Sequence, residues 1–124
     1  MVQSINTTSE LTTKGTSFLG LGEYGKIMIG DKGYEFFNDR NINDYIQIPW
    51  EEVDYVEVSI MFKGKWIPRF AIVTKRNGRF SFSAKDPKQV LRAIREHIPA
   101  DKILKAQTFL GVFKRAALHF FKKG

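Results

Sequence analysis

Side chains that could act as an acid, a base or a nucleophile are few in this chain of 124 residues. Its two histidines, His97 and His119, each lie in a stretch predicted to be helical, and neither has a Ser, Cys or carboxylate partner at a catalytic spacing. The chain has no cysteine, which excludes disulfides, thiolate metal sites and a cysteine nucleophile. We therefore predict that the protein is not an enzyme and has no catalytic residues.

Metal and phosphate chemistry have an equally weak basis. A metal site would have to rest on Asp31 and Asp39, or on the adjacent Glu51 and Glu52, because no cluster of His or Cys adds softer ligands. The segment LGLGEYG (19–25) has the GxGxxG spacing of a phosphate-binding loop, but the KIMIG that follows predicts a strand, not a helix. We predict neither a metal site nor a cofactor and interpret three glycines as turn residues, namely Gly20, Gly22 and Gly25.

A basic and aromatic segment, MFKGKWIPRF (61–70), is the first candidate for a binding surface. Its Lys-Gly-Lys centre is typical of a hairpin turn, and the following proline stiffens the strand. Two interpretations remain open. The lysines protect a sheet edge from aggregation, or the hairpin contacts a partner, because Trp and Arg are the residue types that most often anchor interfaces. In the second interpretation the partner-binding residues are Lys63, Lys65, Trp66, Ile67, Pro68 and Arg69.

The C-terminal segment 101–124 concentrates the positive charge. It carries six of the 20 Lys and Arg residues but one of the 13 Asp and Glu residues, in a chain of net charge +7. On a helical wheel its phenylalanines share one broad arc, which predicts a basic amphipathic helix that packs on its own sheet, docks in a partner's groove or lies at a membrane surface. The partner-binding residues would be Phe109, Phe113, Phe120 and Phe121, and the membrane-surface residues would be Lys105, Lys114, Arg115, Lys122 and Lys123.

Hydrophobic periodicity and turn signals predict the elements that position these residues. Short alternating segments, separated by Gly-, Asn- and Asp-rich turns, indicate antiparallel strands curled into a barrel or sandwich. An amphipathic helix follows, since Asp86 can cap its N-terminus, Pro87 suits its first position and Pro99 stops it. The fold class is therefore mostly β with C-terminal helices (α+β), with predicted strands at residues 13–19, 26–30, 34–38, 45–50, 53–62, 66–74 and 79–84.

Two strands allow finer predictions. Pro49 cannot donate a backbone hydrogen bond, so the strand at 45–50 should end there or lie at a sheet edge, where it could pair two copies into a homodimer. In the strand at 53–62, period-two alternation places one set of side chains toward the core. That predicted core set is Asp54, Val56, Val58, Ile60 and Phe62.

The order of about seven strands and then a helix is that of a pleckstrin-homology-like barrel. We predict a flexible N-terminus at residues 1–10, a pleckstrin-homology-like domain at 11–100 and the basic amphipathic helical tail at 101–124. The N-terminus lacks the basic and apolar regions of a signal peptide, and no apolar stretch reaches the roughly 18–20 residues of a membrane span. We expect a cytoplasmic protein, peripheral at the inner face of the cell membrane.

The chain also resembles a known family. The runs KGTSFLGLGEYGKIMIGDKGYEFFNDRNINDYIQIPWEEVDYV and FKGKWIPRFAIVTKRNGRFSFSAKDPKQVLRAIR are similar to small proteins of a domain of unknown function, encoded beside mannose-type sugar phosphotransferase permeases in Gram-positive bacteria and sometimes labelled ManO. The likeness covers about residues 11–100 and continues more loosely into the tail. It implies a pleckstrin-homology-like fold and a role accessory to sugar uptake, with no established catalytic residues.

These observations favour a noncatalytic accessory or regulatory protein that binds the membrane permease at its cytoplasmic face and modulates sugar uptake. One alternative is a nucleic-acid-binding transcriptional regulator of the same operon, since every charged residue from 59 to 85 is basic and Trp66 could stack on a base. Basic charge alone is nonspecific, so nucleic acid is the less favoured partner. A further alternative is a domain that binds an anionic lipid surface without a protein partner.

Overall fold

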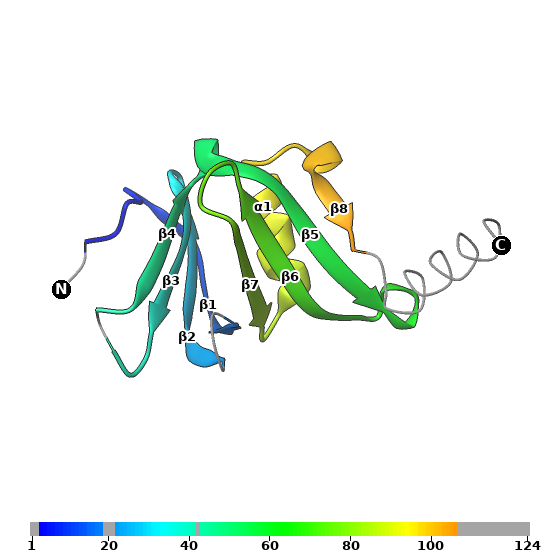
Figure 1. The fold of residues 1–124 in the computed structure, drawn as a ribbon, viewed down its shortest axis with the longest axis horizontal. Helices are drawn as coiled ribbons and strands as arrows, with labels where there is room; N and C mark the ends of the chain where they lie inside the picture. The colour runs from blue at the N-terminus through cyan, green and yellow to red at the C-terminus, as the bar shows by residue number, and fades with distance from the viewer. Residues whose placement is uncertain (1–2, 19–21, 42, 107–124) are drawn as a thin grey trace, which may run out of the picture.

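The computed structural model of the protein describes residues 3–18, 22–41 and 43–106. Within these residues, eight strands form one sheet in the order β4-β3-β2-β1-β7-β6-β5-β8, and one α-helix packs against it (Figure 1). The mostly β, α+β fold class is therefore confirmed. The elements are β1 (Ser9–Ser17), β2 (Glu23–Gly30), β3 (Gly33–Asn38), β4 (Tyr45–Pro49), β5 (Val53–Met61), β6 (Trp66–Thr74), β7 (Arg79–Ala84), α1 (Pro87–Arg95) and β8 (Ile103–Lys105), with short 3-10 turns at Trp50–Glu52, Phe62–Gly64 and Ala100–Lys102.

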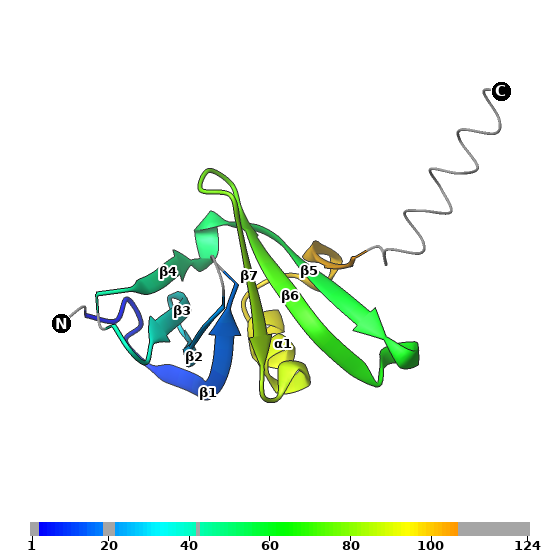
Figure 2. The same ribbon diagram turned by 60° about the horizontal axis from the view of Figure 1, so that its bottom comes forward.

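The sheet consists of two meanders joined through β1. Strands β1 to β4 pair antiparallel in sequence order, as do β5 to β7, and β1 pairs with β7 to connect the two halves. Figures 1 and 2 show that the halves open at an angle to each other, and α1 contacts strands of both. This arrangement leaves the β5–β6 hairpin projecting beyond the body of the domain.

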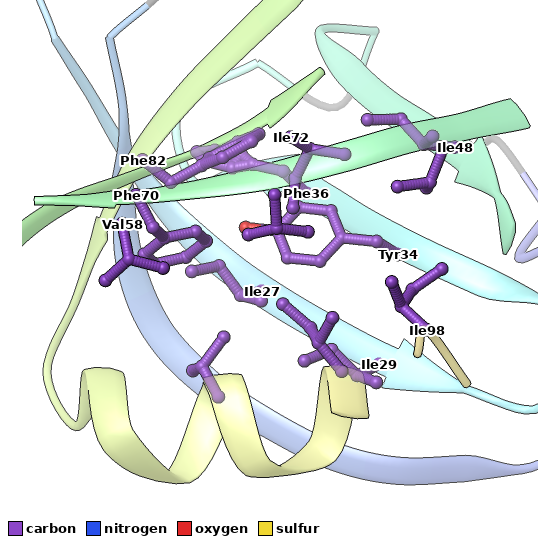
Figure 3. Packing of buried hydrophobic residues seen from close by; sticks show 14 residues of the cluster. Ile27, Ile29, Tyr34, Phe36, Ile48, Val58, Phe70, Ile72, Phe82 and Ile98 are labelled. Atoms are coloured by element: carbon purple, nitrogen blue, oxygen red, sulfur yellow. The ribbon is translucent and has the colours of Figure 1, made fainter. Parts of the chain in front are cut away.

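The core lies between the helix and the bent sheet (Figure 3). Its centre is aromatic: the Tyr34 ring lies 4.9 Å from that of Phe82 and 6.3 Å, edge-on, from that of Phe70. Val90 and Ile94, one helical turn apart on α1, are fully buried against this cluster. The Tyr34 hydroxyl is also buried, without a hydrogen-bond partner among the described residues, and burial raises the pKa of this phenol well above its usual value.

The helix begins as the sequence predicts. The Asp86 carboxylate accepts a hydrogen bond of 3.2 Å from the backbone N–H of Gln89, and Pro87 is the first helical residue. After α1 ends, Ile98 continues the buried stripe, and the chain turns at Pro99. The capping signal and a period of 3.6 therefore place the start of this element, whereas α1 ends at Arg95, before the predicted stop at Pro99.

The structure describes bonded residues before residue 11, the predicted start of the domain. Strand β1 starts at Ser9, and the segment before it is bonded to the β2–β3 hairpin. The Asp31 carboxylate accepts hydrogen bonds of 2.8 and 2.9 Å from the backbone N–H groups of Thr7 and Thr8, and Asn6 caps two backbone N–H groups of the hairpin turn. The backbone hydrogen bond from Thr8, followed by that from Thr7, holds the pKa of Asp31 below its usual value.

The predicted helical tail does not begin as a helix. Residues 103–105 form β8, which pairs in parallel with β5, so the sheet is mixed and not wholly antiparallel as predicted. A short strand that follows α1 can reach β5 because the chain passes through the turn Ala100–Lys102 first. The rest of the predicted helix, residues 107–124, lies outside the described residues.

The predicted core set of β5 is correct only at its centre. Val56 and Val58 are buried and Ile60 is partly so, but Asp54 is exposed and Val53 is buried in its place. The pairing with β6 shifts register between Val53 and Tyr55, and such an irregularity reverses the face of every residue beyond it. Phe62 is also outside the core, since the strand ends before it.

One predicted turn glycine lies within a strand. Gly22 has a left-handed φ of 96°, as expected for a turn, but Gly25 lies in β2 opposite Asn38 of β3. A Cβ atom at Gly25 would collide with the backbone carbonyl of Phe37 and the ring of Phe36. This glycine therefore allows close strand packing, and the third, Gly20, lies outside the described residues.

Candidate functional site

The tip of the β5–β6 hairpin, residues 61–66, presents aromatic and basic side chains to solvent. Phe62 is 67% exposed and Trp66 51% exposed, and their rings stack with centroids 6.0 Å apart at an angle of 20°. Lys63 and Lys65 are exposed beside them. Figure 1 shows the tip at the end of the long β5–β6 arm, away from β1–β4. An exposed pair of stacked rings is unusual, because large aromatic side chains normally bury most of their surface.

The backbone of the tip forms a tight left-handed turn. Phe62, Lys63 and Gly64 have φ values of 54°, 56° and 89°, all in the left-handed region, and the Lys65 N–H donates a 3.2 Å hydrogen bond to the Phe62 carbonyl. Left-handed conformations are costly for residues with a side chain, above all a bulky one such as Phe62, and tend to occur at functional positions. A Cβ at Gly64 would meet no atom within 4 Å, so the turn projects into open space.

The structure brings together only part of the predicted hairpin site. Lys63, Lys65 and Trp66 lie at the tip, but Ile67 packs against the core. Pro68 is half-buried, and the Arg69 guanidinium lies 3.9 Å from the centre of the Phe18 ring. Arg69 is therefore committed to an intramolecular cation–π contact. Sequence reasoning missed two exposed residues of the tip, Met61 and Phe62.

The end of the described chain runs beside the hairpin arm. Because β8 is parallel to β5, it advances toward the tip, and the Ala106 N–H donates a 2.7 Å hydrogen bond to the Val58 carbonyl. Val58 precedes Met61 by three residues, or about 10 Å of strand. Leu104 and Lys105 are exposed on this edge. The other predicted tail residues lie outside the described residues: Phe109, Phe113, Lys114, Arg115, Phe120, Phe121, Lys122 and Lys123.

His97, the histidine in the described region, has structural partners. His97 Nε2 lies 2.7 Å from Glu10 Oε1, and its ring stacks on Trp50 with centroids 4.7 Å apart. Within residues 3–18, 22–41 and 43–106, no group of three or more His, Cys, Asp or Glu side chains is placed to hold a metal ion. His119 lies outside this region. No helix in the described part of the chain is long and apolar enough to cross a membrane.

A buried carboxylate was also missed by sequence reasoning. Glu35 on β3 is fully buried and accepts hydrogen bonds from the Ile5 N–H (3.1 Å), Asn6 Nδ2 (2.7 Å) and Gln47 Nε2 (2.8 Å), as well as from the Ser4 hydroxyl. A buried charge needs such partners to offset its desolvation. Glu35 therefore attaches the N-terminal segment to the outer face of the sheet. No local sequence signal connects residues about 30 positions apart in this way.

Comparisons with known proteins identify a family and a fold. The model of a family described as a domain of unknown function (DUF956) matches residues 1–117. A search of curated proteins found no match to this chain. Among solved structures, the crystal structure of the C-terminal domain of an unknown protein from Leishmania infantum is similar, with a TM-score of 0.62 and 12% identity over 73% of this chain and 83% of that one. At that identity the likeness shows the fold alone.

Proposed function

This chain belongs to the DUF956 family, and we propose that it is a noncatalytic accessory protein that regulates sugar uptake at the cytoplasmic face of a mannose-type phosphotransferase permease. The hairpin tip is the proposed contact surface. The permease as partner rests on the resemblance of the sequence to proteins encoded beside such permeases. The tip adds an independent physical reason to expect a binding protein.

The observation that carries the proposal is the exposed stack of Phe62 and Trp66, with Lys63 and Lys65 exposed in the turn between these two residues. Burying a large apolar side chain contributes about 1.5–3 kcal/mol. The left-handed turn constrains the backbone of the tip, and the two rings already stack on each other before binding, which lowers the conformational entropy lost in a complex. A rigid pair of aromatic rings with flanking positive charge therefore fits the anchor of a protein interface better than a solvated turn.

Within this proposal the domain is pleckstrin-homology-like. The order β4-β3-β2-β1-β7-β6-β5, with α1 after the last antiparallel strand, supports this assignment, and β8 is an addition to it. The basic, Phe-rich segment 107–124 is the second proposed contact. Its sequence pattern predicts an amphipathic helix, which would bind the same partner or the adjacent membrane surface.

Recovery of a tagged permease from membranes tests the proposal. The variant F62A/W66A should recover at least tenfold less permease than the wild type, because it loses both anchors. Tyr24→Ala is the matched control, since Tyr24 is 76% exposed on β2 and lies outside the tip. Equal recovery by the tip variant and the wild type would exclude the tip as the contact. No recovery by any of the three chains would refute the permease as partner.

The same tip favours a second candidate, direct binding to anionic lipid. Each lysine near a negatively charged membrane contributes about 1 kcal/mol, and aromatic rings suit the headgroup region. Sedimentation with phosphatidylserine vesicles tests this candidate: K63E/K65E should abolish binding at low salt, and F62A/W66A should weaken it. Equal sedimentation of these variants and the wild type would contradict it.

The nucleic-acid alternative draws less support from the basic run at residues 63–79. Arg79 forms a bidentate ion pair with Glu57, with N–O distances of 2.8 and 3.0 Å, and Arg69 covers Phe18. The charges left for phosphate contacts are therefore fewer than the sequence suggests. A gel-shift assay at low salt that shows a complex weakened by Trp66→Ala would restore this alternative.

A further inference from the structure

A second surface, on the opposite edge of the sheet, has the features of a peptide-binding site. Among the described residues β5 is covered on its outer side by β8, whereas β4 ends the sheet and has no neighbouring strand beyond it. The Trp50 N–H donates to the Lys32 carbonyl, and the Asn38 N–H donates to the Asp44 carbonyl, both at 3.1 Å. These bonds place the even-numbered residues of β4 in the hydrogen-bonded pairs with β3.

It follows that the odd-numbered residues of β4 direct their backbone groups to the open edge. Tyr45 and Gln47 each offer an N–H and a carbonyl there, and Pro49 offers a carbonyl only. No side chain of β4 carries a charge of the kind that normally protects an edge from strand addition. The protective feature that β4 does have is Pro49, which lacks a backbone N–H. The edge is therefore able to pair with one further short strand.

A groove of about 300 Å³ lies along this edge. Its apolar lining comes from Ile46, Ile48 and Phe80, and its far side from Thr74 and Asn77 at the β6–β7 turn. Side chains of an added strand would alternate between this groove and solvent. Backbone pairing beside a pocket for alternate side chains is the arrangement by which sheets bind extended peptides.

The charge of the groove is opposite to that of the whole chain. Asp44, just before β4, and Glu52, just after it, both line the groove, and none of the lining residues is Lys, Arg or His. Lys75 and Arg76 lie in the nearby turn but do not line it. In a chain of net charge +7, an acidic groove selects a basic ligand.

A second copy of the chain fits this edge poorly. Antiparallel pairing of two β4 strands, with Tyr45 opposite Pro49, would bring Asp44 of one copy within about one residue of Glu51 of the other. Like charges at such positions destabilise strand pairing. The homodimer predicted from the exposed strand is therefore disfavoured by the acids that flank it.

We propose that the β4 edge binds an extended segment of another protein, in which about five residues with alternating apolar side chains lie between a Lys or Arg at each end. The segment adds antiparallel or parallel to β4 and pairs with Tyr45 and Gln47. This site is separate from the hairpin tip and does not depend on the permease as partner.

A synthetic peptide, acetyl-Lys-Val-Thr-Val-Thr-Val-Lys-amide, tests the proposal. Titration into the full chain, followed by amide shifts in the NMR spectrum, should show saturable changes confined to β4 and the β6–β7 turn. The same peptide with Glu in place of both Lys residues should bind roughly tenfold more weakly or not at all. Absence of shifts with the basic peptide at millimolar concentration would overturn the proposal.

Variants separate strand addition from simple charge attraction. Tyr45→Pro removes an edge-facing N–H that does not bond to β3. It should bind the peptide up to roughly tenfold more weakly than Tyr45→Thr, which also loses the tyrosine ring but keeps this N–H. Glu52→Lys should weaken binding of the basic peptide, and Glu51→Lys, outside the groove, should have a smaller effect. Equal binding by Tyr45→Pro and Tyr45→Thr would refute strand addition. Concentration-dependent dimers that Tyr45→Pro abolishes would assign the edge to a second copy instead.

Discussion

Replacing Tyr34 by Phe should stabilise the protein. The Tyr34 side chain is fully buried among Phe70 and Phe82, and its hydroxyl has no hydrogen-bond partner in the described structure. Burying an unpaired hydroxyl costs about 1–3 kcal/mol, whereas loss of the oxygen leaves a void smaller than a methyl group. We expect the free energy of unfolding to rise by about 1 kcal/mol and the melting temperature by a few degrees.

The same substitution has a signature at alkaline pH. Burial raises the pKa of Tyr34 well above 10.0 in the folded state. Above about pH 10 the unfolded chain loses this proton while the folded chain keeps it, so stability falls by up to about 1.4 kcal/mol per pH unit until the folded pKa is passed. Tyr34→Phe lacks this proton, and its unfolding free energy should fall less steeply than that of the wild type.

Urea unfolding at about pH 7 and about pH 10.5 measures both effects. The difference in stability between variant and wild type should grow with pH, because only the wild type carries the phenol. A variant less stable than the wild type by about 1 kcal/mol or more at pH 7 would show that the hydroxyl has a partner. If the unfolding free energies of the two proteins fell equally with rising pH, the loss of stability at alkaline pH would not come from Tyr34.

Three further predictions concern other parts of the fold. Gly25→Ala should destabilise the domain by roughly 2–4 kcal/mol in urea unfolding, since its Cβ would collide with the backbone of β3, and an effect below about 0.5 kcal/mol would contradict the close approach. F62A/W66A should change the melting temperature little, because both rings are exposed; a large drop would mean that the tip is structural. Asp31 has a lowered pKa in the folded protein, so its contribution to stability is present at neutral pH and is lost as the pH falls through that pKa. In the wild type, the Thr8 backbone amide should therefore lose protection from hydrogen exchange in acid, after correction for its intrinsic exchange rate. In Asp31→Asn, the protection of this amide should depend less on pH.

The predicted elements that the structure confirms are those with local causes. The cap at Asp86 and the stripe through Val90 and Ile94 place α1, and the turn at Lys75–Gly78 separates β6 from β7 as expected. In each case neighbouring residues supply the whole signal. Lys63, Lys65 and Trp66 were also identified as an exposed hairpin group from their types and spacing alone.

The features that sequence reasoning missed depend on distant residues. Glu35 is buried only because the segment at Ser4–Asn6 covers it, and β8 forms only because α1 returns the chain to the β5 edge. The register shift between Val53 and Tyr55 reverses which side chains of β5 face the core at that end of the strand. A prediction from alternation alone assumes a regular strand. Phe62 was assigned to the core because periodicity contains no signal for where a strand ends.

The amino-acid sequence by itself determined the mostly β fold class, the capped start of α1 and the membership of a family of unknown function, because periodicity, capping and motif similarity are properties of neighbouring residues. Only the tertiary structure decided that Phe62 is exposed and stacks on Trp66 at the hairpin tip, and that an acidic groove lies beside the open β4 edge. Side-chain exposure and the lining of a groove depend on how separate segments are placed in space, so the geometry of the two proposed binding surfaces follows from the tertiary structure.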